Sequence, residues 1–423
     1  MAKFLVQKSA PLRGEVKISG SKNAVLPIMA AALLTENKCV IKDAPALRDV
    51  EVMCKLLESL GAKVEKNLEN NIVNIEASGN IVYEAPYDLV KMMRASILVI
   101  GALLIRTGRA IIHLPGGCAI GKRPVELHLK GLRALGVSID ENQLNRGIVD
   151  ASVDKLIGNN IYLDFPSVGA TEVIIMTAAL AEGTTILENA AQEPEIVDLA
   201  NFLNKMGARI KGAGTDTIKI EGVKKLGGVS HHVIPDRIEA GTFMVGAAMT
   251  GGNVLIKNIV PDHLKAVIAK LRECGADIQM TDEGMVVRGD KRPLNSTDIK
   301  TLPHPGFPTD MQSPFMALLT VAKGPSVVIE TVFENRFMHV GEFNRMGANI
   351  KTDGNCAIIP GGKALTGAQV VATDLRAGAA VVLTGLVADG TTEVSQIYHV
   401  DRGYEKFVEK LRALGANIMR VEE

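Results

Sequence analysis

The chain has no tryptophan, and other aromatic side chains are scarce among its 423 residues. Ten phenylalanines and five tyrosines provide few of the stacking platforms on which single-stranded nucleic acids bind. Lysine plus arginine and aspartate plus glutamate each number 47, so the chain also lacks the net charge that attracts a polyanion or an anionic membrane. These absences argue against nucleic-acid and membrane partners and confine any anion-binding site to a local cluster of cations.

Paired cysteines and long apolar segments are missing as well. The five cysteines are far apart, without a C-x-x-C pair or histidines at zinc-ligand spacing, so we expect a reduced compartment and no structural metal. The opening "MAKFLVQKSAPLRGEV" lacks the apolar core of a signal peptide, and the apolar run "ILVIGALLI" is about half a membrane span. The sequence therefore predicts a cytoplasmic protein. It also lacks the signatures of phosphate-loop enzymes, serine hydrolases and HExxH metalloproteases.

One short pattern occurs six times in the sequence. It consists of a helix end rich in leucine, then a glycine, then a stretch in which apolar and polar residues alternate. Its glycines are residues 61, 136, 207, 275, 347 and 415, so the spacing is between 68 and 75 residues. Such regular self-similarity predicts six structural units of about 70 residues each.

Each unit has the same predicted elements. An apolar helix rich in alanine and glycine precedes a β-branched strand, and an amphipathic helix with a left-handed glycine C-cap then leads into a strand pair. In the last unit, Tyr404, Phe407, Val408, Leu411 and Leu414 form the apolar stripe of that second helix. The pattern predicts an α/β protein with two similar inside-out domains, each of three units with buried central helices and outer sheets.

The division into domains follows from counting strands. The sixth unit ends after one strand, whereas the chain begins with two unattached strand segments, "KFLVQK" and "GEVKIS". We therefore expect the N-terminus to complete the last unit, with crossovers near Ser21 and Val233. The predicted domains are residues 22–233, and residues 1–21 together with 234–423, with the active site in the cleft between them.

Charged residues recur at equivalent places in these units, at the starts of the apolar helices and in the loops before the amphipathic helices. Helix N-termini bind phosphate and carboxylate groups, and arginine adds bidentate recognition, so these cations indicate a ligand with several anionic groups. Simpler interpretations also fit: N-caps for Ser167, Asp310 and Asp374, and solvated loop charges for Arg48, Arg336, Arg376 and Arg402.

Cys118 lies in an unusual setting. It follows Gly116 and Gly117, which allow close backbone approach to a ligand, and it precedes Lys122 and Arg123. Cationic neighbours lower the pKa of a thiol and favour reactivity. Cys118 is therefore a candidate reactive thiol or, alternatively, a small apolar residue, and the second interpretation applies to the other cysteines: Cys39, Cys54, Cys274 and Cys356.

The chain resembles, from end to end, the enolpyruvyl transferases that use UDP-N-acetylglucosamine. The resemblance rests on "GSKNAVLPIMAAALL", "MRAS", "GGCAIGKRPVELH", "SVGATE", "FPTDMQ", "ENRFMH", "TDLRAGAA" and "DRGYE". It implies an inside-out fold and transfer of the enolpyruvyl group of phosphoenolpyruvate to the sugar 3′-hydroxyl, with release of phosphate. It implies neither a metal nor an organic cofactor. It also implies that the enzyme acts at the start of peptidoglycan synthesis, and therefore in cell-wall formation, cell shape and cell division.

The same resemblance assigns roles to individual residues. It implies that Cys118 is the general acid and the site of covalent attack by fosfomycin, and that Asp310 is the base near the sugar hydroxyl. It implies that Lys22, Arg123 and Arg402 bind phosphoenolpyruvate, and that Lys22 and Arg402 are also catalytic. Arg336 and Arg376 are implied as further cations around the same pocket. The other implied substrate-binding residues are Asn23, Asp49, Arg94, Pro124, Val125, Glu126, Leu127, Ser167, Val168, Gly169 and Val332. The glycine-containing Cys118 segment is expected to close as a lid.

Two alternatives differ in their sequence requirements. The sister enzyme that acts on shikimate 3-phosphate has an Asn-Gly-Thr phosphate motif, which residues 88–95 lack. A non-catalytic repeat scaffold would have lost Cys118, Asp310 and Arg402, which are all present. One departure from many family members is Leu98, which stands where they have a tryptophan that the proposed chemistry does not need.

Overall fold

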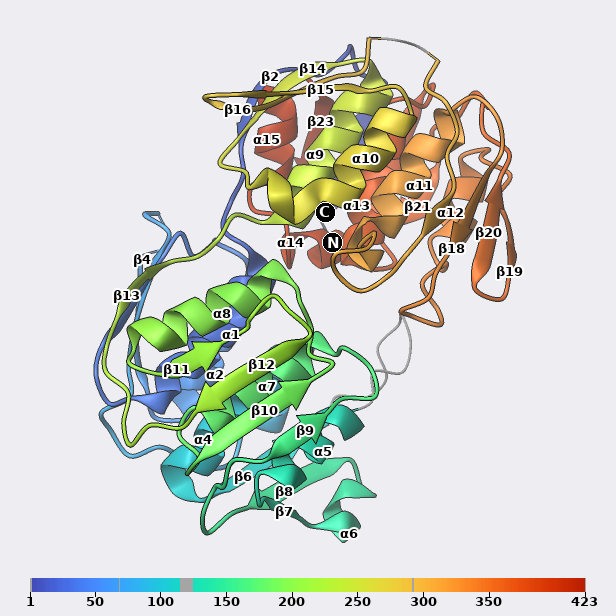
Figure 1. The fold of residues 1–423 in the computed structure, drawn as a ribbon. Coiled ribbons are helices and arrows are strands. Elements are labelled where there is room, and N and C mark those ends of the chain that lie inside the picture. The colour runs from blue at the N-terminus through green and yellow to red at the C-terminus, as the bar shows by residue number, and fades with distance from the viewer. Residues whose placement is uncertain (1, 68, 115–124, 291–292, 423) are drawn as a thin grey trace. The chain divides into compact units, whose positions relative to one another are not determined.

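The computed structural model describes residues 2–67, 69–114, 125–290 and 293–422. These residues form two compact units (Figure 1). Of the described residues, those from Gly20 to Ile234 make up the N-terminal unit, and the C-terminal unit combines those up to Ser19 with those from Pro235 onward. Within the described residues, the chain passes from one unit to the other next to Gly20 and next to Pro235.

Three buried helices form the centre of the N-terminal unit: α1 (Lys22–Ala31), α4 (Ile100–Thr107) and α7 (Val168–Ala178). Their small residues permit close packing, since a Cβ atom added at Gly101 would lie 2.3 Å from the Thr177 hydroxyl oxygen. The 3-10 segments η1 (Ala32–Leu34) and η2 (Arg94–Val99) adjoin α1 and α4.

Three sheets and three amphipathic helices surround this centre. The sheet orders are β13-β3-β5-β4, β6-β8-β7 and β11-β12-β10-β9. The strands are β3 (Cys39–Lys42), β4 (Lys63–Asn67), β5 (Ile72–Glu76), β6 (Arg109–His113), β7 (Ser138–Ile139), β8 (Ile148–Ser152), β9 (Asn160–Tyr162), β10 (Thr184–Glu188), β11 (Arg209–Lys211), β12 (Thr217–Glu221) and β13 (Ser230–His232). The amphipathic helices are α2 (Arg48–Ser59), α5 (Glu126–Ala134) and α8 (Pro194–Lys205), and the short helices are α3 (Tyr87–Val90) and α6 (Glu141–Leu144).

The C-terminal unit repeats this plan, with α9 (Arg237–Thr250), α11 (Gln312–Val321) and α13 (Leu375–Gly385) side by side at its centre (Figure 1). Its sheet orders are β15-β16-β14-β2, β17-β18-β20-β19 and β21-β22-β1-β23. The strands are β1 (Lys3–Gln7), β2 (Arg13–Lys17), β14 (Asn253–Lys257), β15 (Asp277–Thr281), β16 (Gly284–Arg288), β17 (Ile299–Lys300), β18 (Ser326–Ile329), β19 (Lys351–Asp353), β20 (Cys356–Ile359), β21 (Gln369–Val371), β22 (Thr391–Ser395) and β23 (Asn417–Val421). The remaining helices are η3 (Pro261–Leu264), α10 (Lys265–Glu273), η4 (Thr309–Met311), α12 (Val340–Arg345), α14 (Tyr398–Asp401) and α15 (Phe407–Ala413).

The six repeat glycines have the conformation that the sequence predicts. Each follows its amphipathic helix with a φ angle between 91° and 106°, which side chains other than glycine rarely adopt. The α/β fold class and the sixfold arrangement of helix, strand, helix and strand pair are thus confirmed.

The N-terminal strands behave differently from one another. As predicted, β1 completes the last unit, because it lies between β22 and β23 and is antiparallel to both. The expectation that the second segment joins it there is wrong: β2 pairs in parallel with β14 instead (Figure 1).

Five of the sheets contain one parallel strand, and in each case that strand comes shortly before a buried helix in the sequence. At the crossovers these strands are exchanged, so that β13, which precedes α9, pairs with β3 of the N-terminal unit.

The helix expected around Arg94 is also different from the prediction. The sequence suggests one continuous helix with Arg94 a turn inside it, but α3 ends at Val90 and Met93 has an extended backbone with φ −147° and ψ 114°. Arg94 is therefore the first residue of η2 rather than part of a continuous helix.

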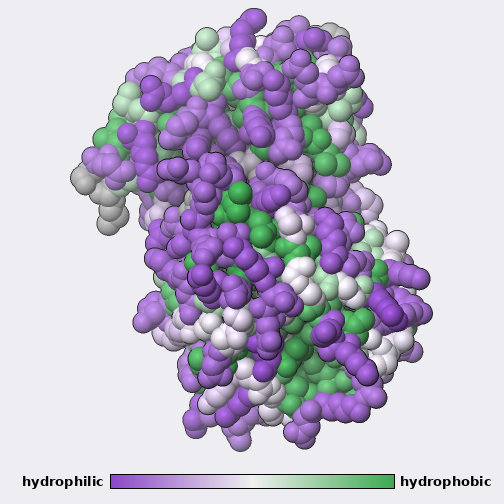
Figure 2. Space-filling view, turned by 90° about the vertical axis from the view of Figure 1, so that its left-hand side faces the viewer, coloured by the Kyte–Doolittle hydropathy of each residue, from purple (hydrophilic) through white to green (hydrophobic). Residues whose placement is uncertain are grey.

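Each unit has its own apolar core, and the charged residues lie mostly outside it. The face drawn in Figure 2 is largely hydrophilic and is interrupted by separate apolar patches. Among the described residues, no helix combines the length and the apolar character that crossing a membrane would require.

Candidate active site

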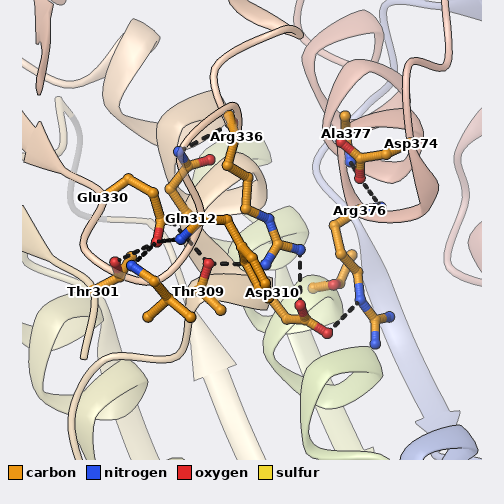
Figure 3. Close-up of polar contacts among 12 residues, drawn as sticks. Thr301, Thr309, Asp310, Gln312, Glu330, Arg336, Asp374, Arg376 and Ala377 are labelled. Atoms are coloured by element: carbon orange, nitrogen blue, oxygen red, sulfur yellow. Dashed lines mark hydrogen bonds and ion pairs between the residues drawn. The ribbon is translucent and has the colours of Figure 1, made fainter. Parts of the chain in front are cut away.

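Two arginines of the C-terminal unit converge on the carboxylate of Asp310 (Figure 3). Arg336 Nη2 donates to Asp310 Oδ1 at 2.7 Å, and Arg376 Nε donates to Asp310 Oδ2 at 3.2 Å. Asp310 belongs to η4, Arg336 to the loop before α12, and Arg376 to the first turn of α13. Three segments that are far apart in the sequence thus meet at one carboxylate.

Both arginines are buried, so the interpretation of Arg336 and Arg376 as solvated loop charges is wrong. Their exposed fractions are 4 % and 1 %, whereas the Asp310 side chain is 26 % exposed. Aromatic rings cover the guanidinium groups, with Phe333 5.2 Å from Arg336 and Tyr404 5.2 Å from Arg376. Two buried cations beside a partly exposed carboxylate form a positively charged site that suits an anion.

Arg376 has donors to spare at this site. Its Nη1 and Nη2 atoms are buried and have no hydrogen-bond partner among the residues that the structure describes. A buried guanidinium group whose terminal nitrogens are unpaired is costly, and a phosphate or carboxylate oxygen would satisfy it.

A second carboxylate lies behind Arg336. Arg336 Nη1 donates to Thr309 Oγ1 at 2.8 Å, and Thr309 Oγ1 in turn donates to Glu330 Oε2 at 2.8 Å (Figure 3). Glu330 follows β18 directly and is 2 % exposed. Sequence reasoning missed Thr309 and Glu330, although a charged residue at the end of the apolar run "SVVIE" was a signal that could have indicated the latter.

The question of helix capping is resolved for the three residues concerned. The Ser167 hydroxyl accepts from the amide of Ala170 at 3.4 Å, and Asp374 accepts from the amides of Arg376 and Ala377 at 2.8 and 3.0 Å. Both are N-caps. Asp310, by contrast, has its carboxylate turned to the two arginines and lies inside η4, whose N-cap is Pro308, so it is not an N-cap.

Lys22 and Asp49 form an ion pair in the N-terminal unit. Lys22 Nζ lies 3.2 Å from Asp49 Oδ2, and the two side chains are 12 % and 3 % exposed. Lys22 is the first residue of α1 and is followed by Asn23, and Asp49 is the second residue of α2. The Asp49 carboxylate therefore orients the ammonium group of Lys22.

Two of the residues expected around the sugar nucleotide, Arg94 and Gly169, lie near His128 of α5. Gly169 lies so close to this ring that a Cβ atom there would be 2.8 Å from His128 Nε2. Burial, and then the nearby charge of Arg94, lowers the pKa of His128 to about 4. Gly169, in the first turn of α7 after the N-cap Ser167 and Val168, and Arg94 thus both neighbour His128. The helix that carries His128 begins with Glu126 and Leu127 after its N-cap Val125.

We predict a pH effect of His128 on stability. Its pKa is about 4 in the folded protein against an ordinary 6.5, so the stability it contributes is present above pH 6.5 and is lost as pH falls towards 4. Between pH 7 and pH 5 the loss is about 2 kcal/mol. Burial raises the pKa of Glu239 to about 7, which works in the opposite direction, so a variant must isolate the histidine.

The measurement is urea unfolding of the wild type and of His128→Gln at pH 7 and pH 5. We expect the free energy of unfolding of the variant to fall by about 2 kcal/mol less over this interval than that of the wild type. Parallel pH dependence in the two proteins would contradict the assignment.

The remaining predicted residues have simple placements. Arg402 is half-buried at the end of α14, where burial of His399 and the charge of Arg402 lower the pKa of that histidine. Val332 lies in the turn after Glu330, whose Oε1 accepts its amide at 2.8 Å. Arg48 is exposed, as a solvated loop charge would be. Cys118, Arg123 and Pro124 lie outside the described residues, and so does most of the expected lid.

Three of the other cysteines have the raised thiol pKa values that are expected of inert, buried side chains. Burial raises the pKa of Cys39 to about 11 and those of Cys54 and Cys274 to about 12. Cys356 is half-buried and is also a free thiol. Among the described residues, no group of three or more histidine, cysteine, aspartate or glutamate side chains is arranged to hold a metal ion.

Residues 6–411 match the family described as EPSP synthase (3-phosphoshikimate 1-carboxyvinyltransferase). The chain belongs to this enolpyruvyl transferase family. It is 62 % identical over 418 residues, 99 % of each chain, to UDP-N-acetylglucosamine 1-carboxyvinyltransferase 1 of Caldanaerobacter subterraneus subsp. tengcongensis. It is 58 % identical over 424 residues, the whole of both chains, to UDP-N-acetylglucosamine 1-carboxyvinyltransferase 2 of Carboxydothermus hydrogenoformans.

Solved structures agree with the enolpyruvyl transferase fold. The enolpyruvyl transferase NikO from Streptomyces tendae superposes with a TM-score of 0.88 at 25 % identity and 99 % coverage of both chains. EPSP synthase from Acinetobacter baumannii gives a TM-score of 0.76 at 20 % identity over the full length of both chains, a likeness of fold alone. As an enolpyruvyl transferase, the protein is a transferase, and the inside-out architecture expected from the repeats is confirmed.

Proposed function

We propose that this enolpyruvyl transferase moves the enolpyruvyl group of phosphoenolpyruvate to the 3′-hydroxyl of UDP-N-acetylglucosamine and releases phosphate. The observation that carries the proposal is the pair of buried arginines on Asp310, with the terminal nitrogens of Arg376 unpaired among the described residues. Two full-length relatives with 62 % and 58 % identity carry the corresponding name. The reaction belongs to the cytoplasm and to the start of peptidoglycan synthesis.

The chemistry requires a proton donor, a proton acceptor and a way to stabilise negative charge. The sugar oxygen attacks C2 of phosphoenolpyruvate while a proton is added to the methylene carbon, and the tetrahedral adduct then loses a proton and expels phosphate. Asp310 takes the proton of the sugar hydroxyl, and Cys118 supplies the proton to the methylene carbon. Neither a metal nor an organic cofactor takes part.

The cations divide between the substrate groups. Lys22, Arg123 and Arg402 bind phosphoenolpyruvate, and Arg376 and Arg336 add positive charge that stabilises the phosphate as it leaves. The paired Lys22 and Asp49 and the buried guanidinium groups support this part of the proposal, because ordered cations cost little reorganisation when a ligand binds.

The N-terminus of α7 supports the binding of a diphosphate. Its Ser167 cap takes the amide of Ala170, and the amides of Val168 and Gly169 precede the first intrahelical hydrogen bond, while Arg94 and the Lys22 side of α1 belong to the same unit. The binding set for the sugar nucleotide is the one implied by the resemblance: Asn23, Arg94, Arg123, Pro124, Val125, Glu126, Leu127, Ser167, Val168, Gly169 and Val332.

The proposal is tested by measuring phosphate release from phosphoenolpyruvate with each of two acceptors. We expect saturable release with UDP-N-acetylglucosamine and none above background with shikimate 3-phosphate. The second acceptor matters because the family description names 3-phosphoshikimate transfer, and preference for it would replace the proposed activity with that of the sister enzyme. Release with neither acceptor from folded protein would favour a scaffold.

A further inference from the structure

Glu330 belongs to the polar groups behind the Asp310 site. It lies immediately after β18, it is 2 % exposed, and the resemblance gives it no role. We infer that Glu330 is a positioning residue that uses its two carboxylate oxygens to orient two different parts of the site, the Arg336 guanidinium group and the turn that contains Val332.

The directions of the hydrogen bonds around Glu330 follow from their neighbours. Thr309 Oγ1 accepts from Arg336 Nη1 at 2.8 Å, so its own proton points to Glu330 Oε2, 2.8 Å away. Thr301 Oγ1 likewise accepts from the amide of Thr331 at 2.9 Å, so its proton points to Glu330 Oε1 at 2.8 Å. Both hydroxyl groups therefore need an acceptor at Glu330, which an ionised carboxylate provides.

The first oxygen, Oε1, orders the turn after β18. Besides the Thr301 hydroxyl, it accepts from the amides of Val332 at 2.8 Å and Phe333 at 3.2 Å. The amide of Thr331 donates to the Thr301 hydroxyl instead, so Glu330 orders three consecutive backbone amides, two directly and one through Thr301. The Phe333 ring that this turn presents lies 5.2 Å from the guanidinium carbon of Arg336.

The second oxygen, Oε2, acts through Thr309. The chain of contacts runs from Glu330 through the Thr309 hydroxyl to Arg336 Nη1, while Arg336 Nη2 donates to Asp310 Oδ1 at 2.7 Å (Figure 3). Gln312 Nε2 adds a contact to the Arg336 carbonyl oxygen at 3.3 Å. The position of Arg336 beside Asp310 therefore depends on a hydroxyl group whose orientation Glu330 sets.

The division of labour makes the two threonines separable. This inference rests on the proposed function, because Arg336 is taken to act on the departing phosphate and Val332 to contact the sugar nucleotide. Thr309 then affects kcat through Arg336, Thr301 affects the binding of the sugar nucleotide through the turn that contains Val332, and Glu330 affects both.

The test compares Thr309→Val, Thr301→Val and Glu330→Gln, substitutions that keep the side-chain volume nearly constant. We expect Thr309→Val to lower kcat roughly 10- to 100-fold with the KM for UDP-N-acetylglucosamine within about threefold of the wild type, because misplacing one charged group has effects of this size. Thr301→Val should raise that KM about tenfold with kcat within about threefold, since it affects a binding turn. Thr309→Ser, which restores the hydroxyl, should recover most of kcat.

A second measurement does not depend on activity. Hydrogen–deuterium exchange of peptides that span residues 331–333 should become faster in Thr301→Val and Glu330→Gln and should stay as in the wild type in Thr309→Val, because only the first two changes touch the amide contacts. A folded wild type without transferase activity would refute the proposed function alone. Unchanged exchange in Glu330→Gln, or equal effects of the two threonine variants on kcat and KM, would overturn the role of Glu330.

Discussion

Asp310→Asn is expected to lower kcat by about 10² to 10⁴, the range that a positioned acid or base contributes, while the KM for UDP-N-acetylglucosamine stays within about threefold. The amide keeps the side-chain volume but cannot take a proton from the sugar hydroxyl. In the wild type the carboxylate accepts from Arg336 at 2.7 Å and from Arg376 at 3.2 Å. The amide would turn its N–H group towards one of these two guanidinium groups, which can only donate.

Asp389→Asn provides the matched control for this change. Its side chain is 64 % exposed and pairs with Lys8 at the surface, so the same substitution there should leave both kinetic parameters unchanged. Circular dichroism and a thermal melt check that the Asp310 variant is folded, since removing one partner from buried cations is destabilising. Equal losses of kcat and sugar-nucleotide affinity would make Asp310 a binding residue rather than the base.

Cys118→Ala is expected to lower kcat by about 10² to 10⁴ and to abolish covalent modification by fosfomycin, because the variant has neither a proton to give nor a nucleophilic sulfur. Intact-mass spectrometry after incubation with the inhibitor counts the adducts. We expect one adduct on the wild type and none on the variant.

Two further variants distinguish proton transfer from nucleophilicity. Cys118→Asp keeps a group that can donate a proton, so it should retain turnover and lose modification. Cys356→Ala removes the half-buried thiol of β20 and should leave both turnover and the single adduct as in the wild type. An adduct that persists on Cys118→Ala would place the reactive nucleophile elsewhere in the chain.

The repeats of this fold could be predicted from the sequence because their signals are local. An apolar stripe and a glycine C-cap are properties of a few neighbouring residues, and the six glycines have the positive φ angles that this reasoning requires. The exchange of β2 and β13 could not be predicted in the same way. Local patterns predict a strand before each buried helix but not the sheet that it joins, and here β2 pairs with β14 and β13 pairs with β3.

The candidate site shows the same limit. Motifs identified Asp310, Arg336 and Arg376, but these residues are 26 and 66 positions apart along the chain, and sequence alone does not show that their side chains meet. Local sequence favoured exposed arginines, whereas the rings of Phe333 and Tyr404 and the carboxylate of Asp310 allow both to be buried. The hydroxyl groups that connect Arg336 to Glu330 become visible only with these contacts.

The most direct test of the central claim is the mass of the product formed from phosphoenolpyruvate and UDP-N-acetylglucosamine, compared for the wild type and Asp310→Asn. We predict that the wild type yields a sugar nucleotide heavier by one enolpyruvyl group, with one phosphate released for each product molecule, and that the variant forms it far more slowly. An unchanged sugar nucleotide after incubation with folded wild-type protein would contradict the account.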